Sequence, residues 1–206
     1  MAPTPPARRI GTPGSKTRAL LVAAAEQLLV EEGYASVTSR RVGVRAGLKP
    51  QLVHYYFRTM DDLFLEIFRT RAEERLARFE RQIAADRSLA TLWRLSSDQR
   101  GAALIMEFAA LANHRKAIRA EVARFAERFR AAQLDALTAI LADAGIDAEE
   151  LPPVAALLVL TGLSQVMTLE QALGVTTGHD ATVAFVERWI TRLEPSGPRS
   201  VVPPRR

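Results

Sequence analysis

Apolar residues recur three and four positions apart along most of the chain, and no stretch alternates between apolar and polar residues as a half-buried strand does. The first such series predicts a helix over residues 17–32, which Gly33 is placed to end. The apolar face of this helix consists of Leu21, Ala24, Ala25, Leu28 and Leu29. The pattern therefore predicts an α-helical protein whose first helix packs one face into a core.

Two short helices follow the first one. Thr38 is a suitable N-cap for a helix over residues 39–46, and Gly47 then interrupts the chain. Pro50 suits the first position of a third helix, because its fixed φ is already helical and no N–H is wanted there. This helix is expected to end near Phe57. A supporting helix before two short helices joined by a glycine turn is typical of a helix-turn-helix.

A longer helix is predicted next. Thr59 and Asp62 match a capping box, so this helix should begin near Met60, and its apolar face continues to about residue 84. Further helices are expected near 88–97, 101–113, 115–144, 151–174 and 179–194. The fold class is thus all-α with about nine helices. The domains expected are a basic arm over 1–15, a helix-turn-helix domain over 16–60, a second helical domain over 61–194, and a tail over 195–206.

Charge is distributed unevenly along the chain, and this indicates a binding partner for the N-terminal part. The first 60 residues hold nine Lys or Arg and three Glu, whereas the remainder is close to neutral. A basic segment with a helix-turn-helix favours a polyanion such as DNA. A basic terminus that merely faces solvent is the alternative. The sequence has no cysteine and only three scattered histidines, so we expect no metal site and no cofactor.

The third predicted helix is the part expected to read DNA. Val53 and Phe57 are four residues apart and should face the core. The other side chains then face the duplex, where Gln pairs with adenine and Arg with guanine, while Tyr, His and Lys reach phosphates.

The segment from Leu20 to Phe68 resembles the N-terminal domain of the TetR family of bacterial repressors. The matching features are Ala24-Ala25, Gly33-Tyr34, Thr38, Ala46-Gly47-Leu48, Tyr55-Tyr56-Phe57 and Asp62-Leu63. The resemblance implies DNA contacts by Thr38, Ser39, Arg40, Lys49, Gln51, His54, Tyr55, Tyr56 and Arg58. The sequence departs from the family at Gly43, where alanine is usual, at His54, where tyrosine is usual, and at Met60, where lysine is common. Arg58 is expected to replace the phosphate contact of that lysine.

The resemblance also implies a homodimer formed by the last two helices and an effector pocket among the fourth to eighth. The dimer residues expected are Leu157, Leu160, Gly162, Val183, Val186, Trp189 and Ile190. The pocket residues expected are Phe64, Phe68, Trp93, Leu104, Met106, Phe108, Leu111, Asn113, His114, Phe125, Phe129, Gln165 and Met167. For every apolar member of both sets, a place in the chain's own core is the alternative.

The expected function is that of a transcriptional regulator in the cytoplasm. The family default is a repressor that leaves a palindromic operator on binding a small hydrophobic or amphipathic effector. Residues 151–169 carry no charge, but their prolines and polar residues favour a buried helix over a membrane span. An enzyme lacks support, since no catalytic motif is present. The other competing class is a helical dimer that acts through protein contacts alone. Whether Arg8 and Arg9 reach DNA is left open.

Overall fold

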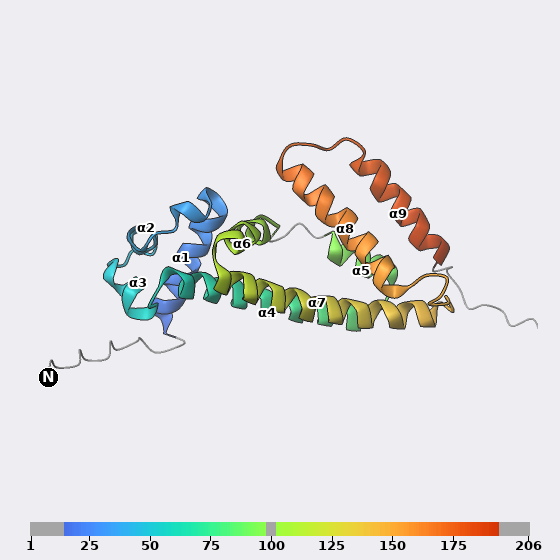
Figure 1. Cartoon of the computed structure of the whole chain (residues 1–206), viewed down its shortest axis with the longest axis horizontal. Helices are drawn as coiled ribbons and strands as arrows, with labels where there is room; N and C mark the ends of the chain where they lie inside the picture. Colours follow the sequence, from blue (N-terminus) through green and yellow to red (C-terminus); the bar gives the residue numbers. More distant parts are fainter. Residues whose placement is uncertain (1–14, 98–101, 194–206) are drawn as a thin grey trace, which may run out of the picture. The chain divides into compact units, whose positions relative to one another are not determined.

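The computed structural model describes residues 15–97 and 102–193, and every regular element in these ranges is helical (Figure 1). This confirms the all-α prediction. The first half contains α1 (Lys16–Glu32), the 3-10 turn η1 (Tyr34–Ser36), α2 (Ser39–Arg45), α3 (Gln51–Tyr56), α4 (Met60–Ala85) and α5 (Leu89–Ser96). The second half contains α6 (Ala102–His114), α7 (Lys116–Asp143), α8 (Pro153–Ala172) and α9 (His179–Leu193). The predicted arm and tail lie outside the described residues.

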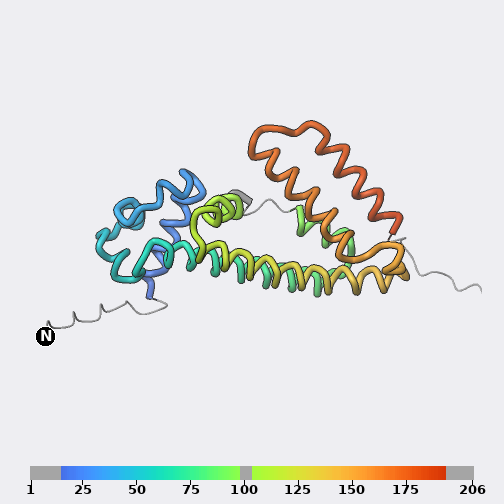
Figure 2. Tube along the Cα trace, in the orientation of Figure 1, coloured from blue at the N-terminus to red at the C-terminus, as the bar shows by residue number. Residues whose placement is uncertain are grey.

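The chain divides into two compact units. Unit 1 comprises residues 1–78 and 100–129, and unit 2 comprises residues 79–99 and 130–206. The predicted helix-turn-helix segment lies within unit 1, together with the first part of α4, α6 and the first half of α7. Helices α4 and α7 are continuous through both units, as the trace in Figure 2 shows.

One hydrophobic core holds unit 1 together. The five apolar residues predicted for the face of the first helix are the five that α1 buries. They pack with Val42 of α2, Val53 of α3, Phe64 of α4 and Phe108 of α6. The two short helices are thereby fixed to long ones, because a helix of six or seven residues is not stable by itself in water.

Side chains at the helix ends explain where the helices begin. The hydroxyl of Thr38 accepts a hydrogen bond from the backbone N–H of Arg41 at 3.3 Å, as predicted. Thr59 and Asp62 form the predicted capping box: each backbone N–H donates to the other's side chain, at 3.0 and 3.1 Å. Pro50 lies just before α3 and already has helical backbone angles, φ −55° and ψ −29°.

Unit 2 is built on α5, α8 and α9. Ser88 caps α5, which buries Leu89, Leu92 and Trp93, and this helix packs against both α8 and α9. The hydroxyl of Ser164 in α8 donates to the backbone carbonyl of Ser96. Helix α8 buries only one side, and α8 and α9 form a hairpin whose ends are joined by the His179–Glu170 contact at 2.8 Å.

Helix α8 is the one described helix that is long and apolar enough to cross a membrane, judged by length and composition only. Because the core helix of a soluble protein passes the same test, this is weak evidence. Helix α8 packs against α5, and this contact lies within unit 2.

Candidate nucleic-acid interface

Helix α3 has a buried side and an exposed side. Val53 and Phe57 are buried, with exposed fractions of 1% and 2%. Gln51, His54 and Tyr55 are exposed, and Tyr56 is half-buried against the core of unit 1. This is the orientation that the spacing of Val53 and Phe57 predicts. The side chains proposed to read DNA therefore lie on the solvent face of a helix that its other face holds in place.

The two tyrosines of α3 contact each other. Their rings meet edge to face, with centroids 5.1 Å apart and planes at 88°. Such a pair is a preferred aromatic geometry. Tyr56 packs against the core, so its ring gives the exposed Tyr55 a fixed neighbour. A large side chain that is already held loses less conformational freedom on binding a partner.

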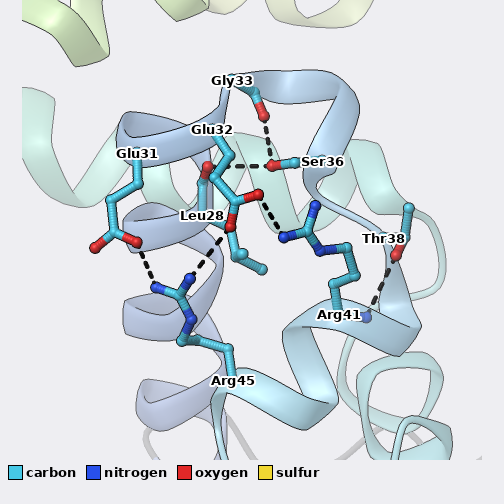
Figure 3. A network of polar contacts seen from close by, with 8 residues as sticks. All are labelled: Leu28, Glu31, Glu32, Gly33, Ser36, Thr38, Arg41 and Arg45. Carbon is cyan, nitrogen blue, oxygen red and sulfur yellow. Dashed lines mark hydrogen bonds and ion pairs between the residues drawn. The ribbon is translucent and has the colours of Figure 1, made fainter.

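Two of the three arginines of α2 are paired with the end of α1 (Figure 3). The guanidinium of Arg45 contacts Glu31 at 2.7 Å and Glu32 at 3.3 Å, and that of Arg41 contacts the other oxygen of Glu32. The hydrogen bond from Arg41 holds the pKa of Glu32 below its ordinary value of 4.5. These pairs join helices whose residues are 9 to 14 positions apart, so the helical repeat gave no sign of them.

Three exposed cations at this surface have no acidic partner among residues 15–97 and 102–193. They are Arg40 at the start of α2, Lys49 before α3 and Arg58 after it. The paired arginines of α2 are largely neutralised by α1, so the uncompensated charge is concentrated around α3. Thr38 and Ser39 lie beside Arg40, and Thr38 uses its hydroxyl oxygen in the cap.

Contacts within unit 1 fix this surface to α4 and α6. Arg18 of α1 pairs with Glu66 of α4, and its guanidinium lies 4.9 Å from the ring centre of Phe57. The carboxylate of Glu107 in α6 accepts a hydrogen bond from the backbone N–H of Tyr34 at 2.9 Å. Sequence reasoning missed both contacts, because each joins residues at least 48 positions apart.

The pocket residues predicted in unit 1 fall into two groups. Phe64, Leu104, Phe108 and Leu111 are buried in the same core that holds α1 and α3. A row of aromatic rings leads away from it: Phe68 meets Phe108 at 5.1 Å and Phe125 at 5.8 Å, and Phe125 stacks on Phe129 at 5.7 Å. Met106 is half-buried, whereas Asn113 and His114 are exposed at the end of α6.

The remaining pocket residues belong to unit 2. Trp93 is buried on α5, Met167 is half-buried and Gln165 is exposed on α8. Three of the polar groups expected to orient an effector, Asn113, His114 and Gln165, are thus at the surface of the single chain. The pocket itself stays a prediction.

The dimer residues predicted from the sequence differ in their burial within the single chain, and their role in a dimer stays a prediction. Leu157, Leu160, Val186 and Ile190 are buried, with exposed fractions of 1% to 5%, so they pack within unit 2. Helical spacing puts these apolar residues on one face of a helix. It does not determine whether the same chain or a second copy covers that face. Val183 and Trp189 are half-buried. Gly162 lies in open space, since a Cβ added there would meet nothing within 4 Å.

Comparison with known proteins gives a family match for the N-terminal helices and a fold match for most of the chain. Residues 21–67 match the family model of bacterial regulatory proteins, tetR family. The same fold occurs in a transcriptional regulator from Rhodococcus sp. Rha1, with 22% identity, a TM-score of 0.64 and coverage of 88% of this chain and 99% of that chain. A TetR transcription regulator from Haloarcula marismortui has 21% identity and a TM-score of 0.64, with coverage of 85% of this chain and 97% of that chain. The fatty acid degradation regulator FadR from Bacillus halodurans has 15% identity and a TM-score of 0.61, with coverage of 91% of this chain and 100% of that chain. No curated protein matches.

The described helices comprise an N-terminal helix-turn-helix and further helices, and they share the fold of solved regulators. Residues 21–67 match the model of the tetR family of bacterial regulatory proteins. Members of this family are DNA-binding transcription factors rather than enzymes.

Proposed function

We propose that the protein is a repressor that binds a palindromic operator as a homodimer and is released by a small hydrophobic or amphipathic effector. Arg40 and Gln51 are the proposed base readers, with guanine and adenine as their preferred partners. Lys49, Arg58 and the hydroxyls of Ser39 and Tyr55 contact phosphates in this proposal, and the exposed imidazole of His54 suits the same role. Thr38 and Tyr56 hold the ends of this surface in place.

The observation that carries the proposal is the sorting of cations around α3. Arg41 and Arg45 are paired with the acids of α1, whereas Arg40, Lys49 and Arg58 are exposed and unpaired within the described ranges. Unpaired cations beside exposed Gln, His and Tyr suit a surface that docks on phosphates and base edges. A helical dimer that acts through protein contacts alone does not require this arrangement.

A second copy is proposed to cover the exposed side of α8. We call this side the α8 face and define it by Val154, Leu158, Val159, Gly162, Val166 and Leu169. Five of these residues are apolar side chains with exposed fractions between 45% and 57%. Contiguous exposed apolar surface marks an interaction site in a soluble protein. Two-fold symmetry would then place two α3 helices for successive major grooves, about 34–36 Å apart.

The effector is proposed to act through unit 1. Phe68, Phe125 and Phe129 form an aromatic row that starts at the core of the DNA-binding helices. A hydrophobic effector that contacts this row would shift α4 or α6. Glu66 pairs α4 with Arg18 of α1, and Glu107 joins α6 to the backbone N–H of Tyr34 in η1. It releases DNA only if it binds the free protein more tightly than the bound form. The Bacillus halodurans protein of the same fold is a regulator of fatty acid degradation, which fits such an effector. Because the proposed action is on DNA, the location we propose is the cytoplasm.

Binding to DNA from upstream of the protein's own gene tests the proposal. Fluorescence anisotropy would compare the wild type with Arg40→Ala at two salt concentrations. We expect affinity to fall steeply with salt, because phosphate contacts release counterions. Loss of one base contact costs about 1–3 kcal/mol, and the proposed dimer would lose two, so R40A should weaken operator binding at least tenfold.

The matched control is Arg45→Ala, which removes the same charge from the same helix. Arg45 is engaged by Glu31 and Glu32, so R45A should change operator affinity less than threefold. Equal loss in the two variants would indicate binding by net charge alone. Weak binding that is indifferent to sequence, for every DNA fragment tried, would favour the helical dimer that acts through protein contacts.

A further inference from the structure

Helix α2 lies unusually close to the start of α3 at one position. Gly43 is buried, and a Cβ built on it would lie 2.9 Å from both the Cα and the N of Pro50 and 3.0 Å from the carbonyl oxygen of Leu48. Real Cβ atoms essentially never approach other atoms that closely. All three neighbours are backbone atoms, so no side-chain rotation can make room.

The backbone angles of Gly43 do not require glycine. Its φ is not positive, in contrast to that of Gly33 or Gly47, and it lies inside a helix, where glycine is a poor residue. Gly162, the other glycine within a described helix, has nothing within 4 Å of its missing Cβ. The feature that explains Gly43 is therefore the close approach of two backbones. The N–H of Leu48 also donates to the carbonyl of Gly43, at 2.8 Å, which fixes the turn to α2.

This contact lies between the two sets of proposed DNA-reading residues. Ser39 and Arg40 are one helical turn before Gly43 on α2, and Gln51 follows Pro50 directly on α3. The distance from α2 to α3 at Gly43 thus determines how far Arg40 lies from Gln51. An alanine would have to move Pro50 by at least 0.5 Å to reach an ordinary contact of 3.4 Å. Base-edge hydrogen bonds are sensitive to shifts of that size, because they need short distances and good alignment.

We propose that Gly43 is a specificity-determining, positioning residue: its missing side chain sets the spacing between Arg40 and Gln51 and so selects which operator sequence the protein prefers. This inference rests on the proposed function, because it requires that both side chains read DNA.

Selection from a randomised double-stranded DNA library, followed by affinity measurements on the selected sequences, tests the proposal. The full chain with Gly43→Ala is compared with the wild type and with Val44→Ala, which alters the neighbouring position of α2 at a side chain that is 71% exposed. G43A should bind the wild-type operator at least tenfold more weakly and select a different sequence. Its affinity for random DNA should be unchanged, because no phosphate-binding side chain is removed. V44A should select the wild-type sequence.

Folding and function are separated by two further measurements. Thermal melting and circular dichroism are recorded for every variant, and G43A is also prepared with Thr70→Ala and Thr138→Ala, which raise helix propensity at exposed positions of α4 and α7. Failure of this triple variant to fold would overturn the inference, because Gly43 would then serve stability alone. An unchanged selected sequence in G43A would overturn it as well. A wild type that selects no sequence would instead contradict the proposed function.

Discussion

At the scale of single residues, the same residue type has different roles at neighbouring positions. Arg40, Arg41 and Arg45 lie on one short helix, and their sequence context does not separate them. The fold does, because Glu31 and Glu32 at the end of α1 lie opposite two of them and not the third. Exposed ion pairs of this kind contribute little stability. Their main consequence here is that Arg40 is the arginine of α2 without an acidic partner among the described residues.

The capping box of α4 can be tested with a single hydroxyl. Thr59→Ala removes the acceptor for the backbone N–H of Asp62 and should lower the free energy of unfolding by about 1 kcal/mol, measured by urea denaturation. Thr59→Ser keeps the hydroxyl and is the control, with stability close to that of the wild type. Equal stability of T59A and the wild type would show that the N–H finds another partner.

At the scale of elements, α4 and α7 are joined in unit 1 by arginine–carboxylate pairs. Arg69 donates two hydrogen bonds to Glu121, each 3.0 Å long, and Arg128 donates to Glu73 at 2.6 and 3.2 Å. The hydrogen bonds from Arg69 hold the pKa of Glu121 below its ordinary value of 4.5, and that from Arg128 does the same for Glu73. These acids therefore favour the folded state when they are ionised.

The pH dependence of one pair follows from this direction. A lowered pKa stabilises the folded state above the unfolded value of about 4.5, and the effect disappears as the pH falls through the lower folded value. Glu121→Gln should therefore melt at a lower temperature than the wild type at pH 7, and the difference should shrink below pH 4.5. Glu127, at an exposed position of the same helix, forms no ion pair within residues 15–97 and 102–193, so Glu127→Gln should match the wild type throughout. A difference for E121Q that grows in acid would contradict the assignment.

Helix α8 carries a second prediction at this scale. In an isolated chain, Gly162→Ala would raise stability by about 1 kcal/mol, because alanine favours the helix and the space is open. If a second copy covers the α8 face, the added methyl group lies between two helices. We therefore expect G162A to raise the dissociation constant of the dimer, measured by analytical ultracentrifugation. Thr138→Ala, at an exposed position of α7, should leave dimerisation unchanged. A more stable G162A with unchanged association would place the dimer contact elsewhere.

At the scale of the whole molecule, the α8 face is a stretch of apolar side chains that the described chain leaves exposed. The length and apolarity of α8 are also those of a membrane-crossing helix. In the proposed dimer, a second copy would cover the exposed side, while α5 of the same chain packs against α8.

A charge placed on this face should separate the copies. Val166 is 54% exposed, and Val166→Glu would bury a carboxylate in the proposed interface. We expect a monomer by light scattering. Operator affinity should fall at least tenfold, because a monomer contacts one half-site of the operator whereas a dimer contacts two. Ala126→Glu, an equivalent change at an exposed position of α7, should remain dimeric. A dimeric V166E with full operator affinity would exclude the α8 face as the interface.

Much of this protein was determined by local sequence alone. The periods of three and four residues predicted the helices, and the Thr38 cap and the Thr59–Asp62 capping box fixed where two of them begin. The spacing of Val53 and Phe57 determined which side of α3 faces the core. These features depend on residues within about four positions of one another, so the order of the amino acids contains them directly.

Only the tertiary structure decided which surfaces are free. Leu157 and Leu160 carry the same apolar signal as Leu158 and Val159, yet the first two are buried by unit 2 and the others are exposed. Arg40 likewise differs from Arg45 only through acids on another helix. The approach of Gly43 to Pro50 is set by the angle between two helices. Such outcomes depend on contacts between distant segments, and hydrophobic periodicity has no information about which segment will cover a given face.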